Sequence, residues 1–288
     1  MKSILSLMAL AAILFTSCDK IDQPVLDFNI QYRADLYGPA PSFGPAPTAT
    51  INVLIEDFTA HQCGFCPDAG VTADEIIETY PGRVSVVAIH AGPLALTKDE
   101  EEDEGFTTDW TNADGDLLWD QLDFQVNPIG RINRIGGPGE IVNPNTWVAK
   151  TNELINQTAP VNLQLAVNYG TLGGHLNVHF NAQFPDSYEN ATKITVYITE
   201  SGIQDWQLWY GEDPEYVEDY EFKHVLRGSV TGPLGLNFTT ESVAANTEIQ
   251  VDYSLVWNTD WAVENCSAIV LITDNVTGEV LNVIEAHL

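Results

Sequence analysis

The stretch Ile51-Asn-Val-Leu-Ile-Glu-Asp-Phe-Thr-Ala-His-Gln-Cys-Gly-Phe-Cys-Pro67 decides the fold of the first half of the chain. Its first eight residues are rich in apolar and β-branched side chains, which predicts a strand. A short helix over residues 73–80, ended by Pro81-Gly82, and an apolar strand over residues 83–90 follow. Strand, helix and strand at this spacing predict two parallel strands joined by a right-handed crossover.

The pair Cys63-Gly-Phe-Cys66 lies after the first strand and at the start of the helix. Backbone N–H groups at such a place stabilise a thiolate, so we expect Cys63 to be a nucleophile with a lowered pKa. Cys66, one turn further on, faces the interior and is expected to resolve the mixed disulfide. The alternative is an inert disulfide that clamps the loop to the helix. A zinc site is disfavoured because His61 is the one further ligand close in sequence.

The remainder of the first half predicts a small α/β layer over residues 51–158. A polar loop contains the acidic run Asp99 to Glu104 and precedes an amphipathic helix over residues 116–124. A strand over residues 129–135 and a helix over residues 146–156 complete the layer.

From Pro160 onward the pattern changes to short alternating strands. Six or seven are expected, among them residues 161–168, 176–180, 194–199, 249–255, 268–272 and 280–284. This pattern of short alternating strands predicts an immunoglobulin-like antiparallel β-sandwich over residues 159–288. The fold class is therefore α/β plus all-β. Cys266 falls in one of these strands, where a buried, unreactive thiol is expected.

The N-terminus has the order of a secretory signal: Lys2, an apolar run and then Thr16-Ser-Cys18. Residues 1–18 resemble a bacterial lipoprotein signal with its lipobox, in which Cys18 is acylated and anchors the mature protein to a membrane. A plain signal peptide with a chance cysteine is the alternative. Residues 19–50 carry Gly38-Pro-Ala-Pro41 and Gly44-Pro-Ala-Pro47, which predict a stalk that lifts the first domain off the membrane.

Charge excludes some partners. With 11 basic and 41 acidic side chains, the formal net charge is −30, so a surface that tracks nucleic-acid phosphates is excluded. The 44% apolar fraction supports buried cores rather than disorder. No phosphate-binding glycine loop or dinucleotide fingerprint is present, and we expect no metal and no cofactor.

The segment Asp57 to Cys66 resembles the active-site segment of thioredoxins. The resemblance implies that Asp57 accepts the proton of Cys66. Glu56, one residue earlier, is expected to point to the other face of the strand. Val126-Asn-Pro-Ile129 resembles the loop whose cis-proline faces the cysteines, so Pro128 is expected to be cis and to present backbone to a substrate. Asn127, Phe65 and His61 are the expected substrate contacts. His61 as an imidazolium would favour the thiolate; an exposed loop histidine without a role is the alternative.

A second resemblance covers most of the mature chain. Residues 56–67, 127–134 and 222–228 together resemble the 28-kDa outer-membrane lipoprotein family of Bacteroidetes. The resemblance implies a lipid-anchored protein of the outer membrane, periplasmic or surface-exposed, with a thioredoxin-like domain. It brings no established reaction.

Trp206, Trp209 and Tyr210 crowd one acidic stretch. Aromatic faces beside acceptor groups suit a peptide or a glycan, and aromatics that cover the end of the sandwich core are the alternative. The leading hypothesis is thiol–disulfide exchange with envelope proteins that carry thiols or disulfides. The rival is a surface binding or adhesion lipoprotein with a structural Cys63–Cys66 bond. The exchange hypothesis requires sulfur atoms that a partner can reach.

Overall fold

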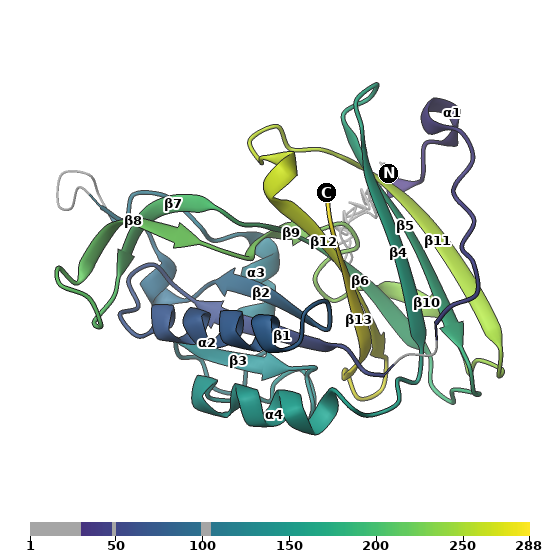
Figure 1. Cartoon of the computed structure of the whole chain (residues 1–288), viewed down its shortest axis with the longest axis horizontal. Coiled ribbons are helices and arrows are strands. Elements are labelled where there is room, and N and C mark those ends of the chain that lie inside the picture. Colours follow the sequence, from purple (N-terminus) through teal and green to yellow (C-terminus); the bar gives the residue numbers. More distant parts are fainter. Residues whose placement is uncertain (1–29, 48–49, 99–104) are drawn as a thin grey trace, which may run out of the picture.

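The computed structural model describes residues 30–47, 50–98 and 105–288, and β-strands dominate it (Figure 1). The largest sheet holds β1 (Val53–Thr59), β2 (Val84–His90), β3 (Ile129–Ile132), β6 (Thr192–Glu200), β9 (Val225–Ser229), β10 (Leu236–Thr239), β12 (Cys266–Asp274) and β13 (Val280–His287). A second sheet holds β4 (Asn162–Gly170), β5 (His175–Phe184) and β11 (Thr247–Val256). Strands β7 (Ile203–Leu208) and β8 (Tyr216–Phe222) form a separate hairpin.

The α-helices of the described residues are α1 (Ala34–Tyr37), α2 (Cys66–Thr79), α3 (Ala113–Trp119) and α4 (Trp147–Leu154). Within the same residues, short 3-10 helices lie at Pro93–Ala95, Pro144–Thr146 and Val263–Asn265. None of the helices in the described part of the chain is long and apolar enough to cross a membrane.

The expected parallel crossover is confirmed. Strands β1 and β2 pair in parallel from Val53↔Val84 to Thr59↔His90. Helix α2 packs Ala73 and Ile76 into an apolar cluster on one face of these strands. The helix is longer than predicted because it already begins at Cys66, where Pro67 suits the first turn.

The two halves of the chain share one sheet, whereas the sequence predicted two separate units. The order is β13-β12-β6-β9-β2-β1-β3, with β10 beside β6. Strand β9 joins the halves: it pairs with β2 through Ala88↔Val225 and with β6 in the antiparallel direction. An unpaired edge on β2 would expose backbone hydrogen-bonding groups, and β9 covers that edge.

The second half contributes two sheets at the right of Figure 1, with an apolar core between them. Phe180 and Leu176 of β5 share one apolar cluster with Val196 of β6 and Val270 of β12. The cluster also contains Cys266, which is fully buried, and burial raises the pKa of its thiol to about 12. The unreactive thiol expected there is confirmed.

The described part of the predicted stalk does not stand free, which corrects that expectation. Gln31 forms an isolated bridge with Tyr253 of β11, and the Arg33 amide donates to Ser254 Oγ at 3.0 Å. The Tyr37 hydroxyl lies 3.0 Å from His175 Nδ1. These contacts hold residues 30–37 along the second sheet, because tyrosine rings there find histidine partners. Cys18 and the acidic run 99–104 lie outside the described residues.

Two predicted elements have shifted ends. Helix α3 begins at Ala113 rather than at residue 116, because Asn112 caps it by accepting a hydrogen bond from the Gly115 amide at 2.8 Å. Strand β3 ends at Ile132 rather than at residue 135. Asn133 and Arg134 have φ angles of 46° and 50°, which lie outside the β region.

Candidate functional site

Cys63 and Cys66 form a disulfide with Cα atoms 5.4 Å apart. The chain leaves β1, turns through residues 60–65 and enters α2 at Cys66, whose amide donates to the Cys63 carbonyl at 3.1 Å. Both cysteines are buried, with 3% and 2% of their surface exposed. This corrects the expectation of an accessible pair at the edge of the crossover.

The hairpin β7–β8 accounts for much of this burial. The Leu208 amide donates to the His61 carbonyl and the Tyr210 amide to the Gly64 carbonyl, both at 2.9 Å. The Gln207 side-chain amide donates to the Cys63 carbonyl at 3.2 Å. A strand from the second half of the chain is therefore bonded along the loop that carries the disulfide.

The aromatic residues singled out in the sequence belong to this hairpin and to the chain just after β7. Tyr210 packs so closely on Gly64 that a β-carbon there would lie 2.6 Å from its ring. Trp209 donates from Nε1 to Asp68 Oδ1 at 3.0 Å, and Trp206 packs on Phe106 with ring centroids 6.3 Å apart. The alternative in which they cover the end of the sandwich core is wrong, because they contact the disulfide loop and its surroundings.

Asp57 lies on β1 with its side chain turned toward α2. It is 3% exposed, and its Oδ1 atom is buried with no hydrogen-bond partner in the described chain. Burial raises the pKa of this carboxyl to about 8, so it is mostly protonated at neutral pH. Asp57 and Cys66 line the same pocket.

The Asn127–Pro128 peptide bond is cis, as expected, and immediately precedes β3. Strand β3 pairs with β1 through Phe58↔Ile129, so Pro128 lies at the end of β1 from which the disulfide loop departs. The Asn127 side-chain amide donates to the carbonyls of Phe58 and Thr59 at 3.1 and 3.3 Å. Asn127 therefore fixes the loop on the strand, and the substrate contact expected of it stays a prediction.

Phe65 and His61 differ in exposure. Phe65 is 61% exposed and packs edge-on against Tyr210, with ring centroids 5.1 Å apart. His61 is buried, and its Nε2 lies 3.1 Å from the Leu96 carbonyl oxygen. Burial lowers its pKa, which disfavours the imidazolium that the first interpretation required. The exposed-loop alternative is also wrong.

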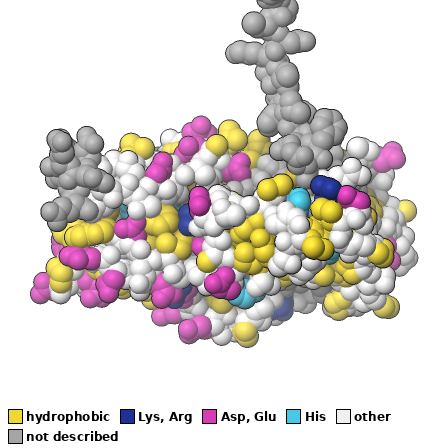
Figure 2. Space-filling view, turned by 90° about the horizontal axis from the view of Figure 1, so that it is seen from above, with side chains coloured by type: hydrophobic (Ala, Val, Ile, Leu, Met, Phe, Trp, Pro, Cys, Tyr) yellow, Lys and Arg dark blue, Asp and Glu magenta, His cyan; other side chains and the backbone are white. Residues whose placement is uncertain are grey.

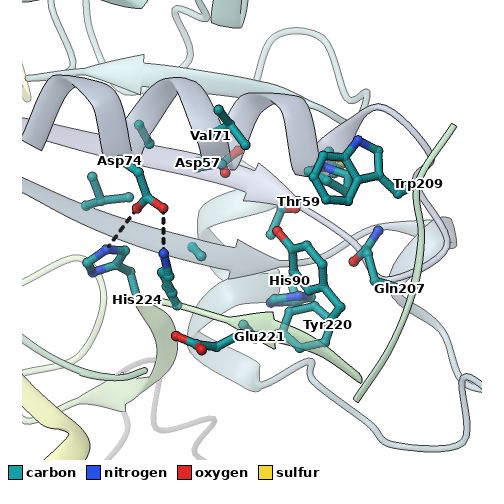
Figure 3. A pocket seen from close by; sticks show the side chains of 18 residues that line it. Asp57, Thr59, Val71, Asp74, His90, Gln207, Trp209, Tyr220, Glu221 and His224 are labelled. Carbon is teal, nitrogen blue, oxygen red and sulfur yellow. Dashed lines mark hydrogen bonds and ion pairs between the residues drawn. The ribbon is translucent and has the colours of Figure 1, made fainter. Parts of the chain in front are cut away.

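The pocket behind the disulfide has a volume of about 340 Å³ and lies between α2, the two parallel strands and β8 (Figure 3). Asp57, Thr59 and His90 lie on its floor. Tyr220 stands beside His90, and Trp209 and Gln207 lie at the same end. At the other end Asp74 pairs with Lys223 at 2.8 Å and approaches His224 at 3.8 Å.

His90 is a residue that the sequence interpretation missed. It is 3% exposed, and both ring nitrogens lack a hydrogen-bond partner within the described residues. Burial lowers its pKa to about 3, and His61 and Arg227 add to the effect. A signal existed: parallel strands end at the same sheet edge, so the last residue of the second strand, His90, lies beside Thr59.

The surface is acidic, and acidic side chains gather at the end of the molecule that carries β7 and β8 (Figure 2). Seven of the twenty residues from 203 to 222 are Asp or Glu, and none is Lys or Arg. Across the described ranges no group of three or more His, Cys, Asp or Glu side chains could hold a metal ion.

Fold and site together define a mostly β protein in which a hairpin covers a disulfide at the start of a helix. The family model described as "Outer membrane protein Omp28" matches residues 116–288, more than half of the 288 residues. The chain belongs to this Omp28 family. The description of the family places the chain at the outer membrane. The matched region begins after the disulfide.

Two solved structures are similar to the chain. HBP35 of Porphyromonas gingivalis has a TM-score of 0.59 at 16% identity, over 84% of this chain and 76% of that one. A domain of the outer membrane lipoprotein Omp28 from Porphyromonas gingivalis has a TM-score of 0.29 at 18% identity, over 45% of this chain and 88% of that one. No curated protein matches the chain.

Proposed function

We propose that this envelope protein exchanges thiols and disulfides with partner proteins through Cys63 and Cys66. The observation that carries the proposal is the shared pocket of Cys66 and Asp57, a buried carboxyl whose Oδ1 atom has no hydrogen-bond partner among the described residues and whose pKa is raised to about 8. A carboxyl that served only stability would be expected to have a hydrogen-bond partner when it is buried.

The chemistry uses the proton held by Asp57. A partner thiolate attacks the Cys63 sulfur, the Cys63–Cys66 bond breaks, and Cys66 leaves as a thiolate. Asp57 gives its proton to that thiolate and becomes a carboxylate. A second partner thiolate then attacks the mixed disulfide and releases Cys63, so the partner dithiol is oxidised and the pair is reduced. The reverse sequence reduces a partner disulfide.

Access to the sulfur atoms is part of the proposal. Since both cysteines are buried beneath β7, a protein partner reaches Cys63 after the hairpin moves away. Strands β7 and β8 pair with each other and with no other described strand, so this movement breaks no strand pairing of the two larger sheets. It must break the hydrogen bonds and ring contacts between the hairpin and the disulfide loop.

The fold supports the finer domain assignment as a proposal. The parallel β1–α2–β2 unit, antiparallel β3 and cis-Pro128 favour a thioredoxin-like part over residues 51–158. The two packed sheets favour an immunoglobulin-like sandwich over residues 159–288. In this arrangement β9 joins the two parts into one sheet. Acylated Cys18 is the proposed anchor.

A second candidate is a surface binding or adhesion lipoprotein in which Cys63–Cys66 is a permanent bond. Burial of both cysteines favours it, because a structural bridge needs no access. In that case the exposed rings of Phe65 and Tyr210 offer a contact for a peptide or a glycan.

The reduction potential of the pair distinguishes the two candidates. Equilibration of the purified protein in glutathione buffers should give a potential between about −270 and −120 mV if the pair exchanges. A value below roughly −300 mV, typical of resistant structural bridges, would contradict exchange.

Trapping identifies the partner. Cys66→Ser leaves Cys63 without its resolving thiol, so mixed disulfides with envelope proteins should accumulate in cells that express the variant. The matched control is the double variant Cys63→Ser/Cys66→Ser, which should trap nothing. Equal yields from both would exclude a reaction at Cys63.

A further inference from the structure

The pocket in Figure 3 runs from a buried polar floor to an exposed rim. Asp57 and His90 on the floor are each 3% exposed. At the rim Val71 is 46% exposed, and the side chain of Lys223 is 45% exposed. The pocket therefore connects the interior beside Cys66 with the surface between α2 and β8.

Three buried polar atoms on the floor have no hydrogen-bond partner in the described structure: Asp57 Oδ1 and both ring nitrogens of His90. Buried polar groups in proteins are satisfied by protein or by ordered water. The volume of about 340 Å³ far exceeds the roughly 15 Å³ that one water needs, and the site is polar.

We propose that this pocket is a water-filled proton path to Asp57, and that His90 is a positioning residue that holds its innermost water. The inference rests on the proposed thiol–disulfide exchange and extends it. Once Asp57 has given its proton to the Cys66 thiolate, a buried carboxylate remains. Water held between Asp57 and His90 returns a proton from solvent to that carboxylate, so the next cycle begins with a protonated acid.

Ionisable groups of α2, β8 and the neighbouring loops surround the path. Asp74 on α2 is paired with Lys223, and the nearby His224 contributes most to lowering the pKa of Asp74. Tyr220 on β8 stays neutral, since burial raises its pKa to about 12. Glu221 lines the pocket, while His61 and Arg227 act on His90 and oppose its protonation. His90 therefore stays a neutral ring with one N–H donor and one acceptor, which suits it to hold a water.

The test is the titration of Asp57 in the oxidised full-length protein in detergent, followed by the carboxyl band in infrared difference spectra and assigned with Asp57→Asn. His90→Leu removes both nitrogens and keeps an apolar side chain of similar size. The midpoint near pH 8 should rise by about one unit or more, because the carboxylate loses hydration. His90→Gln keeps a donor and an acceptor and should leave the midpoint nearly unchanged.

A rate measurement complements the titration. The rate at which Asp57 regains its proton after reduction of the disulfide by dithiothreitol at pH 7, followed by the same infrared carboxyl band, should fall about tenfold in His90→Leu and recover in His90→Gln, because the variant lacks the group that holds the proton-carrying water. An unchanged midpoint and rate in folded His90→Leu would overturn the inference. If His90→Leu does not fold, Ala88→Ile fills the pocket beside Asp57 instead, with the same two expectations.

The outcomes also separate this inference from the proposed function. The titration of Asp57 needs no partner protein. If the midpoint shifts in His90→Leu but the reduction potential of the pair lies below roughly −300 mV, the water path is supported and thiol–disulfide exchange is contradicted. A normal potential with no shift in either His90→Leu or Ala88→Ile would retain exchange and reject the path.

Discussion

On the two faces of strand β1, neighbouring carboxyl groups have pKa values shifted in opposite directions. Glu56 faces away from α2 and forms ion pairs with Arg131 at 2.8 Å and with Arg134 at 2.7 Å. Burial would raise its pKa, but the two guanidinium groups outweigh burial and hold the pKa at about 2. Asp57, the next residue, has no such partner, and its pKa is about 8.

The difference shows that the charge of Glu56 serves the stability of the fold, whereas the carboxyl of Asp57 is suited to proton transfer. The Glu56 carboxylate is needed to neutralise two buried cations and is in no position to release or accept a proton near neutral pH. The Asp57 carboxyl is buried without compensation, an arrangement that costs stability and recurs where proteins handle protons. The alternation of a β-strand is what places the two on opposite faces.

Removal of the charge on Glu56 should have the largest effect on stability. Glu56→Gln leaves Arg131 and Arg134 buried without a counter-ion, so the free energy of unfolding should fall by about 3–5 kcal/mol. Urea denaturation at pH 7 measures it. A loss below about 1 kcal/mol would show that the two faces of β1 are not different in this way.

Asp57 should respond to pH in the opposite sense. The unfolded chain releases the Asp57 proton near pH 4, whereas the folded chain keeps it until about pH 8. Between these values the folded state binds more protons, so stability falls as pH rises and levels off above pH 8. Asp57→Asn removes this loss, and its advantage over the wild type should grow by about 1.4 kcal/mol per pH unit.

Denaturation of both proteins at pH 5, 6 and 7 checks this slope, because the other titrating groups are common to both. If the difference between them stays constant across that range, Asp57 is ionised in the folded chain and the comparison with Glu56 fails.

An effect of intermediate size is expected when the contact between the β7–β8 hairpin and the disulfide loop is weakened. Gly64→Ala places a β-carbon 2.6 Å from the Tyr210 ring, so the ring must move and the cover over the disulfide should loosen. If the free energy that keeps the hairpin closed over the disulfide falls by about 1 kcal/mol, reduction by dithiothreitol should become about fivefold faster. Gly44→Ala is the matched control, since its β-carbon meets nothing within 4 Å. Equal rates in both variants would remove the hairpin as the barrier to access.

The smallest effect is expected from an exposed ion pair. Lys150 and Glu153 lie 2.9 Å apart on α4, with side chains 47% and 61% exposed. Lys150→Ala should change the free energy of unfolding by about 0.5 kcal/mol or less, because solvent screens the pair. A loss as large as that of Glu56→Gln would mean that burial is not what makes the Glu56 pairs strong.

Local patterns identified many elements and the pair that carries the chemistry. Apolar runs and Pro81-Gly82 predicted both strands and the helix of the parallel crossover, and the Val126 to Ile129 motif predicted the cis bond at Pro128. Strands β7, β8 and β10 were missed. In β8, Tyr216 to Phe222 mixes acidic and aromatic residues, so its hydrophobic periodicity is weak.

The sequence by itself determined where the disulfide could form, because Cys63 and Cys66 are three positions apart at the start of a helix. It also determined which faces of β1 Glu56 and Asp57 occupy, since alternation is a local property of a strand. Only the tertiary structure decided that residues 207–210 cover the disulfide and that β9 extends the sheet beyond β2. Contacts between segments more than a hundred residues apart depend on how whole elements pack, and no local pattern specifies that packing.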